Sequence, residues 1–323
     1  MKAAVRDRFG PPAVVEIREV DKPAPADDEV LVRVRASSVN LSDWYAVTGR
    51  PWVARGTMGI RKPKSEPLGT DYAGVVESVG KDVTQFEPGD EVFGGRSGAW
   101  AEYVVAKADR GIVPKPANVT FEEAAAVPVA ALTALQGLRD KGRLQPGQKV
   151  LINGASGGVG TLAVLVAKAL GAEVTAVCST RNVEQARSLG ADRVVDYNQK
   201  DFTRSDRRYD LLLDVAGSRS WRACKRVLDP QGTFVVIGGP RKSRLVGPLG
   251  GVIKKKLGGV LGRRKVVFFV AKFNKEDMEV LRELLEAGKM TPFIDGRYEL
   301  SEVVDALEHM GEGHPGGKIV LTV

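Results

Sequence analysis

The residues most clearly arranged for chemistry form a glycine-rich loop at 150–160, VLINGASGGVG. Residues typical of a buried strand precede it and a helical pattern follows it, which is the setting of a dinucleotide-binding fingerprint. Gly157 lets the backbone approach a pyrophosphate, and Gly160 lets the helix pack closely on the strand. The N-terminus of that helix offers unpaired N–H groups and a positive dipole end to phosphates. We therefore expect a dinucleotide here; the alternative is a tight turn without ligand.

The residues that would contact the ribose 2′-position of that dinucleotide lie about 20 residues further on. They are 178–182, CSTRN, and no acid occurs between Val174 and Val183. A carboxylate there accepts hydrogen bonds from a ribose 2′-OH and repels a 2′-phosphate, whereas hydroxyls and a guanidinium bind the phosphate. This segment predicts NADPH rather than NADH. The alternative is a polar loop that only caps the next helix.

The supply of cysteine and histidine excludes other chemistries. The cysteines are Cys178 and Cys224, without a CxxC pair, which excludes a disulfide framework and a cysteine-rich zinc site. The histidines are His309 and His314, too few for a multi-histidine metal centre and poorly placed for a Ser-His-Asp triad. We expect both cysteines to be buried fillers and both histidines to be exposed and without a catalytic role.

The size and composition of the chain indicate a globular protein of two domains. It has 323 residues, 43% hydrophobic and 27% charged. No apolar run is longer than 266–271, which is far shorter than the ~20 residues that span a bilayer. Arg6, Asp7 and Arg8 interrupt any secretory signal, so a cytoplasmic location is the expectation.

The net charge of +8 is local, because 241–265 holds nine Lys or Arg and no acid. Its apolar residues follow a helical stripe from Leu245 to Leu261, interrupted by glycines and Pro248. Four interpretations stay open: a lid over a substrate site, a dimer contact, a weak membrane-surface contact, or a solvated basic face. We expect no nucleic-acid partner, because neither interleaved aromatics nor a known nucleic-acid motif accompanies the charge.

Two kinds of element would position these residues. Residues 1–125 contain short strands between Gly/Pro turns, which predicts a β-barrel or sandwich; at 30–36 valines alternate with Leu31, Arg33 and Arg35. From about Phe121, strands alternate with helices, which predicts a doubly wound parallel sheet and an α/β fold. The expected strands are 149–153, 173–179, 210–215 and 233–237, the expected helices are 161–170 and 183–189, and the chain closes with a helix around 300–307 and a strand at 318–323.

These motifs together resemble the medium-chain dehydrogenase/reductase superfamily, and within it the zinc-independent quinone oxidoreductase branch that includes ζ-crystallin. The resemblance covers nearly the whole chain. It is carried by 38–43 (SVNLSD), 68–76 (LGTDYAGVV), 88–93 (PGDEVF), 131–134 (ALTA), the glycine loop and 189–192 (LGAD). It implies a GroES-like catalytic domain at 1–125, to which 290–323 return, a Rossmann NADPH-binding domain at 126–289, and a homodimer.

The sequence departs from the zinc-dependent alcohol dehydrogenases at the zinc ligands. Where those enzymes carry Cys, His and Cys, motif alignment places Asn40, Thr70 and Val129. These side chains cannot form a tetrahedral zinc site, and the four-cysteine structural lobe is also missing. An acceptor that is already electron-poor needs no Lewis acid, so we expect hydride transfer from NADPH to quinones or α,β-unsaturated carbonyls. The alternatives are an NAD(P)-dependent alcohol dehydrogenase without zinc and a non-enzymatic, membrane-associated NADPH-binding protein.

The resemblance also assigns roles to residues. It places Tyr45 and Asn40 at the nicotinamide and substrate as catalytic residues; the alternative is a tyrosine and an amide that serve packing. Asp43 is expected to be structural. The expected cofactor-binding residues, besides Tyr45, are Thr133, Ser156, Gly157, Gly158, Val159, Ser179, Thr180, Arg181, Tyr197, Val215, Ala216, Gly217, Ile237, Gly238, Gly239, Phe269, Val270, Gly317 and Lys318.

Overall fold

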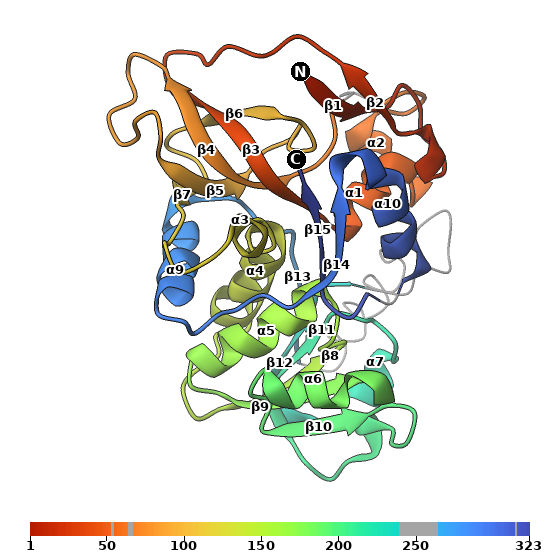
Figure 1. The fold of residues 1–323 in the computed structure, drawn as a ribbon. Coiled ribbons are helices and arrows are strands. Elements are labelled where there is room, and N and C mark those ends of the chain that lie inside the picture. Colours follow the sequence, from red (N-terminus) through yellow and green to blue (C-terminus); the bar gives the residue numbers. More distant parts are fainter. Residues whose placement is uncertain (53–54, 64–66, 239–263, 314) are drawn as a thin grey trace. The chain divides into compact units, whose positions relative to one another are not determined.

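The computed structural model of the protein describes residues 1–323 except 53–54, 64–66, 239–263 and 314 (Figure 1). The chain divides into two compact units. The first comprises Met1–Leu132 and Lys272–Val323, and the second comprises Thr133–Ala271. Within the described residues, no helix has the length and apolar character needed to cross a membrane.

The first unit is built on a seven-stranded sheet whose central strand is β3 (Glu29–Val39). One edge of β3 pairs antiparallel with β4 (Asp71–Val79). Its other edge pairs with β6 near its start and with β15 near its end. The further strands of this unit are β5 (Glu91–Gly95), β6 (Tyr103–Lys107), β7 (Ile112–Pro114), β14 (Ile294–Glu299) and β15 (Lys318–Thr322), with β1 (Lys2–Val5) and β2 (Glu16–Glu19) as a separate antiparallel pair.

The alternation predicted for β3 is present, with one exception. Val30, Val32 and Val34 are buried in one apolar cluster, while Arg33 is exposed. Leu31, expected to face outward, is also buried, at 4% exposure. A strand in the middle of a sheet can be covered on both faces, and period-two alternation does not reveal that.

Helices cover the sheet of the first unit. They are α1 (Leu41–Thr48), α2 (Arg55–Met58), α3 (Phe121–Ala125), α9 (Lys275–Glu286) and α10 (Val303–Glu312), with short 3-10 helices at Pro12–Val14 and Leu300–Glu302. Helix α1 begins after Asn40 and ends at Gly49, whose φ of +60° is a left-handed cap. Helix α10 buries Val303, Ala306 and Leu307 in a core shared with β15. The helical stripe of the sequence, Leu300, Val303, Val304 and Leu307, is only partly confirmed, because Leu300 lies in the preceding 3-10 turn and Val304 is partly buried.

The second unit is a six-stranded parallel sheet in the order β10-β9-β8-β11-β12-β13. This is the doubly wound order with a switch point between β8 and β11. The strands are β8 (Lys149–Asn153), β9 (Glu173–Cys178), β10 (Arg193–Asp196), β11 (Tyr209–Asp214), β12 (Leu228–Val236) and β13 (Lys265–Phe268). The helices are α5 (Gly158–Ala169), α6 (Val183–Ser188) and α7 (Trp221–Cys224), with 3-10 turns at Thr180–Asn182 and Phe202–Arg204. Figure 1 shows α5 and α6 on the same face of this sheet.

The division between the units differs from the boundaries expected at 125/126 and 289/290. Helix α4 (Pro128–Leu135), followed by a π-helical turn at Gln136–Lys141, spans the first boundary. Helix α9, expected in the Rossmann domain, belongs to the first unit, where it lies beside β7 (Figure 1). Asn118 Nδ2 donates to the carbonyl of Leu285 over 3.1 Å, which ties the C-terminal end of α9 to that unit. A helical pattern shows which face is apolar but not which sheet it covers.

Candidate functional site

Three glycines shape the loop between β8 and α5, each for a different reason. Gly154 has a φ of +93°, which favours glycine. A Cβ on Gly160 would lie 2.0 Å from the carbonyl oxygen of Gly154, so helix and loop touch there. A Cβ on Gly157, by contrast, would meet no atom of the described residues within 4 Å. The backbone at Gly157 is therefore open to the approach of a ligand.

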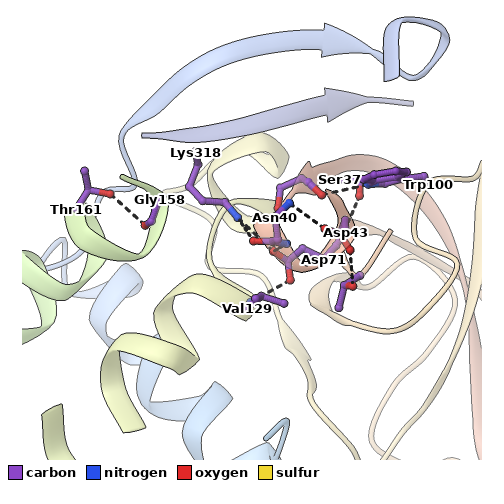
Figure 2. A network of polar contacts seen from close by, with 11 residues as sticks. Ser37, Asn40, Asp43, Asp71, Trp100, Val129, Gly158, Thr161 and Lys318 are labelled. Carbon is purple, nitrogen blue, oxygen red and sulfur yellow. Dashed lines mark hydrogen bonds and ion pairs between the residues drawn. The ribbon is translucent and has the colours of Figure 1, made fainter. Parts of the chain in front are cut away.

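The N-terminus of α5 has the features of an anion site. Gly157 is its N-cap and contributes no side-chain cap, and its first turn contains no acid. The first N–H groups of a helix have no partner within the helix. Thr161 is buried, and its hydroxyl donates to the carbonyl of Gly158 (3.2 Å, Figure 2), so it does not occupy those N–H groups. The predicted pyrophosphate ligands, Ser156, Gly157, Gly158 and Val159, are all partly exposed. We call residues 156–159, at the N-terminus of α5, the cradle. Its open backbone and its N–H groups, unpaired within the helix, fit a dinucleotide phosphate.

Two buried polar side chains, which the sequence analysis missed, hold the neighbouring strand ends together. Asn153 Nδ2 donates to Asp214 Oδ1 over 2.7 Å, and the N–H of Gly217 donates to the same oxygen over 2.9 Å. The N–H groups of Val215 and Ala216 both donate to the carbonyl of Asn153 over 3.0 Å. The predicted turn 215–217 is thereby fixed against the glycine loop at the switch point of the sheet. The sequence carries a signal for this contact, because Asn153 and Asp214 each end an apolar strand.

The strand end after β12 also approaches closely. A Cβ on Gly238 would lie 2.2 Å from the carbonyl oxygen of Val215, so only glycine fits there. The N–H of Ile237 donates to the carbonyl of Asp214 over 2.9 Å. Gly239, also predicted to bind the cofactor, lies outside the described residues.

The segment predicted to read the ribose has an acidic neighbour that the sequence analysis did not consider. Because β9 and β10 pair in parallel, Asp196 lies opposite Cys178. Thr180 Oγ1 donates to Asp196 Oδ2 over 2.7 Å, and the N–H of Tyr197 donates to the carbonyl of Cys178. Ser179 is half-buried and Arg181 is exposed. The absence of an acid from 175–182 therefore does not make the pocket free of carboxylate.

The remaining predicted cofactor residues are dispersed. Thr133 is half-buried on α4, within the second unit. Phe269 follows β13, with Lys141 Nζ 5.8 Å from its ring centroid, and Val270 is 76% exposed. Gly317 belongs to the first unit, and a Cβ there would lie 2.4 Å from the carbonyl oxygen of Phe293. Packing alone thus accounts for glycine at 317.

The predicted catalytic residues lie on α1 of the first unit. Asn40 is the N-cap, and its N–H donates to Asp43 Oδ2 over 2.8 Å. Tyr45 lies one turn further on and is half-buried, its ring in an edge contact with Trp44 at 5.6 Å between centroids. The sequence from Asn40 to Tyr45 is thus a capped helix start that holds both side chains on one element.

Around Asn40 lies a buried polar network (Figure 2). Asp71 Oδ2 accepts from Asn40 Nδ2 over 2.9 Å and from Ser38 Oγ over 2.8 Å, while its Oδ1 accepts the N–H of Val129 over 2.9 Å. Lys318 Nζ donates to Asn40 Oδ1 over 2.6 Å and lies 3.4 Å from Asp71 Oδ2. Asp71 was not predicted as a site residue; the signal for it in the sequence is a lone acid at the start of an apolar strand.

The second carboxylate of the network is Asp43. Its Oδ1 accepts from Thr70 Oγ1 over 2.9 Å, and its side chain is buried. Burial, reinforced by the charge of Asp71, raises the pKa of Asp43 to about 6. Burial also lowers the pKa of Lys318, against the opposing charges of Asp71 and Asp43. Asp43 caps α1 and binds Thr70, which are the contacts that the expected structural role requires.

The donor set at this place does not fit zinc. The three positions that the resemblance matches to zinc ligands carry an amide, a hydroxyl and an apolar side chain. The hydrogen bonds above already engage Asn40 and Thr70. The ammonium of Lys318 directs its positive charge at the amide oxygen of Asn40. Among the described residues, no group of three or more His, Cys, Asp or Glu side chains could hold a metal ion.

The two histidines and two cysteines were only partly predicted. Cys178 and Cys224 are buried, as expected. His309, expected to be exposed, is 26% exposed and lies between Asp295 Oδ2 (3.2 Å from Nε2) and the hydroxyl of Tyr298 (3.1 Å from Nδ1). The expectation was wrong because β14 runs alongside α10, a contact that spacing along the chain does not reveal. His314 lies outside the described residues.

Comparisons with known proteins agree with this architecture. Residues 26–117 match the alcohol dehydrogenase GroES-like domain, and 189–321 match a family described as zinc-binding dehydrogenase. A chloroplastic quinone oxidoreductase from Triphysaria versicolor is 33% identical over 342 residues, covering 99% of this chain and 98% of the relative. The chain belongs to the medium-chain dehydrogenase/reductase superfamily.

Two further relatives define the branch of the superfamily. A 2-methylene-furan-3-one reductase from Solanum lycopersicum is 32% identical over 340 residues, covering 99% of this chain and 79% of the relative. The structure of a quinone oxidoreductase from Coxiella burnetii superposes with a TM-score of 0.86 at 31% identity, covering 100% of this chain and 99% of that one. The superfamily member described here is an NAD(P)H-dependent oxidoreductase of the quinone and enone reductase type. The predicted family, fold class and enzyme class are confirmed.

Proposed function

We propose that the chain reduces quinones or α,β-unsaturated carbonyls with NADPH and without zinc. The observation that carries this proposal is the network at Asn40. Where zinc-dependent members of the superfamily polarise an alcohol or ketone, this chain presents an amide held between a lysine and an aspartate. Hydrogen-bond donors alone suit an acceptor whose carbon is already electron-poor, because less charge must be stabilised on its oxygen. The tomato relative's named substrate is such a conjugated enone.

The second unit binds the cofactor, and the first unit orients the substrate. In the second unit, the N-terminus of α5 and Gly157 bind the pyrophosphate, and the turns after β11 and β12 border the same switch point. Bound NADPH supplies the hydride. In the first unit, the side-chain NH₂ of Asn40 and the hydroxyl of Tyr45 donate to the substrate oxygen and orient it. Both side chains come from one capped helix, which limits their motion relative to each other.

The preference for NADPH over NADH rests on Ser179, Thr180 and Arg181. Arg181 is exposed, so its charge-assisted contact with a 2′-phosphate is screened by salt. Asp196, bonded to Thr180, opposes the phosphate by repulsion. We therefore propose a modest preference for NADPH, nearer to about tenfold than to the hundredfold that an unopposed arginine contact would give.

The test is NADPH and NADH oxidation across a panel of quinones, enones, saturated aldehydes and ketones. We expect turnover with quinones and enones and very slow turnover with saturated carbonyls, with NADPH bound more tightly. Ser179→Asp should remove the cofactor preference, because it adds repulsion for the phosphate and an acceptor for the 2′-OH. Reduction of saturated ketones faster than quinones would contradict the proposal and favour an alcohol dehydrogenase.

Three expectations remain predictions from the sequence: a homodimer, a cytoplasmic location, and a weak membrane-surface contact through 241–265. Most of that basic segment, 241–263, lies outside the described residues. Its membrane role has a direct test, because an electrostatic contact should capture the protein on anionic vesicles at low salt and release it at high salt.

A further inference from the structure

Lys318 is a buried cation inside the first unit. It begins β15, its side chain is 2% exposed, and that of its partner Asp71 is fully buried. β15 pairs with β3, whose last residue precedes Asn40, and this pairing brings together residues from opposite ends of the chain. The short contact, 2.6 Å, is to the amide oxygen of Asn40; the distance to Asp71 is 3.4 Å. The ammonium is therefore aimed first at a neutral group.

Lys318 and Asp71 together fix which way the amide of Asn40 points. An ammonium can only donate hydrogen bonds and an ionised carboxylate can only accept them. In the observed orientation, Oδ1 meets the ammonium and Nδ2 meets the carboxylate. Rotating the amide by half a turn would place its NH₂ against the ammonium and its oxygen against the carboxylate, and both contacts would be repulsive. The pair also polarises the amide, which strengthens Nδ2–H as a donor.

The network leaves one donor of this amide for a ligand. Nδ2 carries two hydrogens, and within the part of the chain that the structure describes its hydrogen-bond acceptor is Asp71 alone. Asp71 receives donors from four groups, the others being Ser38, the N–H of Val129 and Lys318, so it is satisfied as an anion. The second hydrogen of Nδ2 is the one through which Asn40 can bind a substrate oxygen.

We propose that Lys318 is a positioning residue that orients and polarises the Asn40 amide, and that it does not bind the cofactor. Its ammonium contacts Asn40, one of the three positions that motif alignment matches to the zinc ligands of zinc-dependent members. The proposal rests on the function proposed above for its effect on turnover, but the amide orientation itself does not. It replaces the role that the resemblance gave to Lys318, because the ammonium is already directed at Asn40 Oδ1 and Asp71 Oδ2.

The first test is Lys318→Met, which keeps the length of the side chain and removes its charge, with the exposed Lys289→Met as matched control. We expect kcat to fall by about tenfold in Lys318→Met while the Kd for NADPH changes by less than about twofold. The control should behave as the parent protein in both measurements. A tenfold weaker NADPH affinity with unchanged kcat would overturn the proposal and restore the cofactor-binding role.

A double-mutant cycle then asks whether Lys318 acts through Asn40. If it does, the double variant Lys318→Met, Asn40→Ala should be about as slow as Asn40→Ala alone, because both changes remove the same interaction. Multiplied effects, about a hundredfold in the double variant, would show that Lys318 acts independently and would overturn the proposal.

Removing one member of a buried charge pair can unfold a protein, so a second variant removes both charges. The variant Lys318→Met, Asp71→Asn should fold, as judged by thermal unfolding, yet stay as slow as Lys318→Met. Recovery of the parent kcat with the fold would assign Lys318 a purely structural role and overturn the proposal.

A spectroscopic readout separates this inference from the function. In the ¹H–¹⁵N spectrum of the parent protein, the side-chain NH₂ signals of Asn40 are assigned by their loss in Asn40→Ala. They should move in Lys318→Met, or in the doubly neutral variant, and stay in place in Lys289→Met. Unmoved signals would overturn the proposal that Lys318 fixes the orientation of the Asn40 amide, even in an active enzyme. Absence of turnover in the parent protein with every quinone and enone would instead contradict the proposed function. The effect of Lys318 on the Asn40 amide could still be measured by its NH₂ signals.

Discussion

Thr180 Oγ1 donates to Asp196 Oδ2 over 2.7 Å, which joins the ends of two adjacent parallel strands. Asp196 also accepts the N–H of Asn198, so its carboxylate organises the loop on which Tyr197 lies. The residue that stabilises the proposed 2′-phosphate pocket thus carries the charge that opposes a phosphate. On the function proposed above, we expect the balance between Arg181 and Asp196 to set the cofactor preference.

Asp196→Asn should shift this balance. The amide oxygen can still accept from Thr180, while the negative charge is gone, so NADPH should bind about threefold to fivefold more tightly and NADH about equally well. Fluorescence titration of both cofactors at two salt concentrations measures this. Asp206→Asn, an exposed acid of the same unit, is the control. An equal gain for NADH would show that the carboxylate does not face the phosphate.

The glycine loop should separate stability from binding. Gly160→Ala forces a Cβ to 2.0 Å from a backbone oxygen and should lower the free energy of unfolding by about 2–3 kcal/mol. In Gly157→Ala the new Cβ meets no atom of the part of the chain that the structure describes. The variant should therefore keep its stability within about 0.5 kcal/mol, while binding NADPH about tenfold more weakly.

Urea unfolding and fluorescence titration measure the two effects in each variant. Gly56→Ala, whose Cβ also meets open space but lies outside the cradle, controls for the added methyl group. Parent-like NADPH affinity in Gly157→Ala would remove the pyrophosphate from this loop.

Asp43 should make stability depend on pH. Its pKa is raised from 3.8 to about 6 in the folded protein, so the folded state holds the proton more tightly than the unfolded chain. The stabilisation is fully present below pH ~4 and is lost as the pH rises through about 6, an effect on the order of 2–3 kcal/mol.

The measurement is the free energy of unfolding of the parent protein and of Asp43→Asn from pH 4 to 7.5. The parent should lose stability relative to the variant as the pH rises, with most of the change between pH 4 and 6. Parallel curves would mean that Asp43 titrates alike in both states.

Metal content is the fourth prediction. With Asn40, Thr70 and Val129 at the ligand positions, the purified protein should hold well under about 0.1 zinc per chain, and chelators should leave turnover unchanged. Elemental analysis before and after dialysis measures this. A finding of about one zinc per chain, lost together with activity on chelation, would contradict zinc-free chemistry.

The sequence by itself determined the local features of this protein. The glycine loop, the alternation of apolar strands and helices, and the motifs at 38–43 and 68–76 were sufficient for the superfamily, the Rossmann sheet and the glycine turn between β8 and α5. These features are local because strand periodicity, a helix N-terminus and the lack of a Cβ act within a few neighbouring residues.

Only the tertiary structure decided the contacts between distant segments. Pairing of β9 with β10 set Asp196 against Thr180, and pairing of β15 with β3 set Lys318 against Asn40. The packing of α9 on the first unit and of His309 on Asp295 depended in the same way on which elements became neighbours. Strand order and register bring such residues together, and neither is encoded in the spacing of residues along one segment.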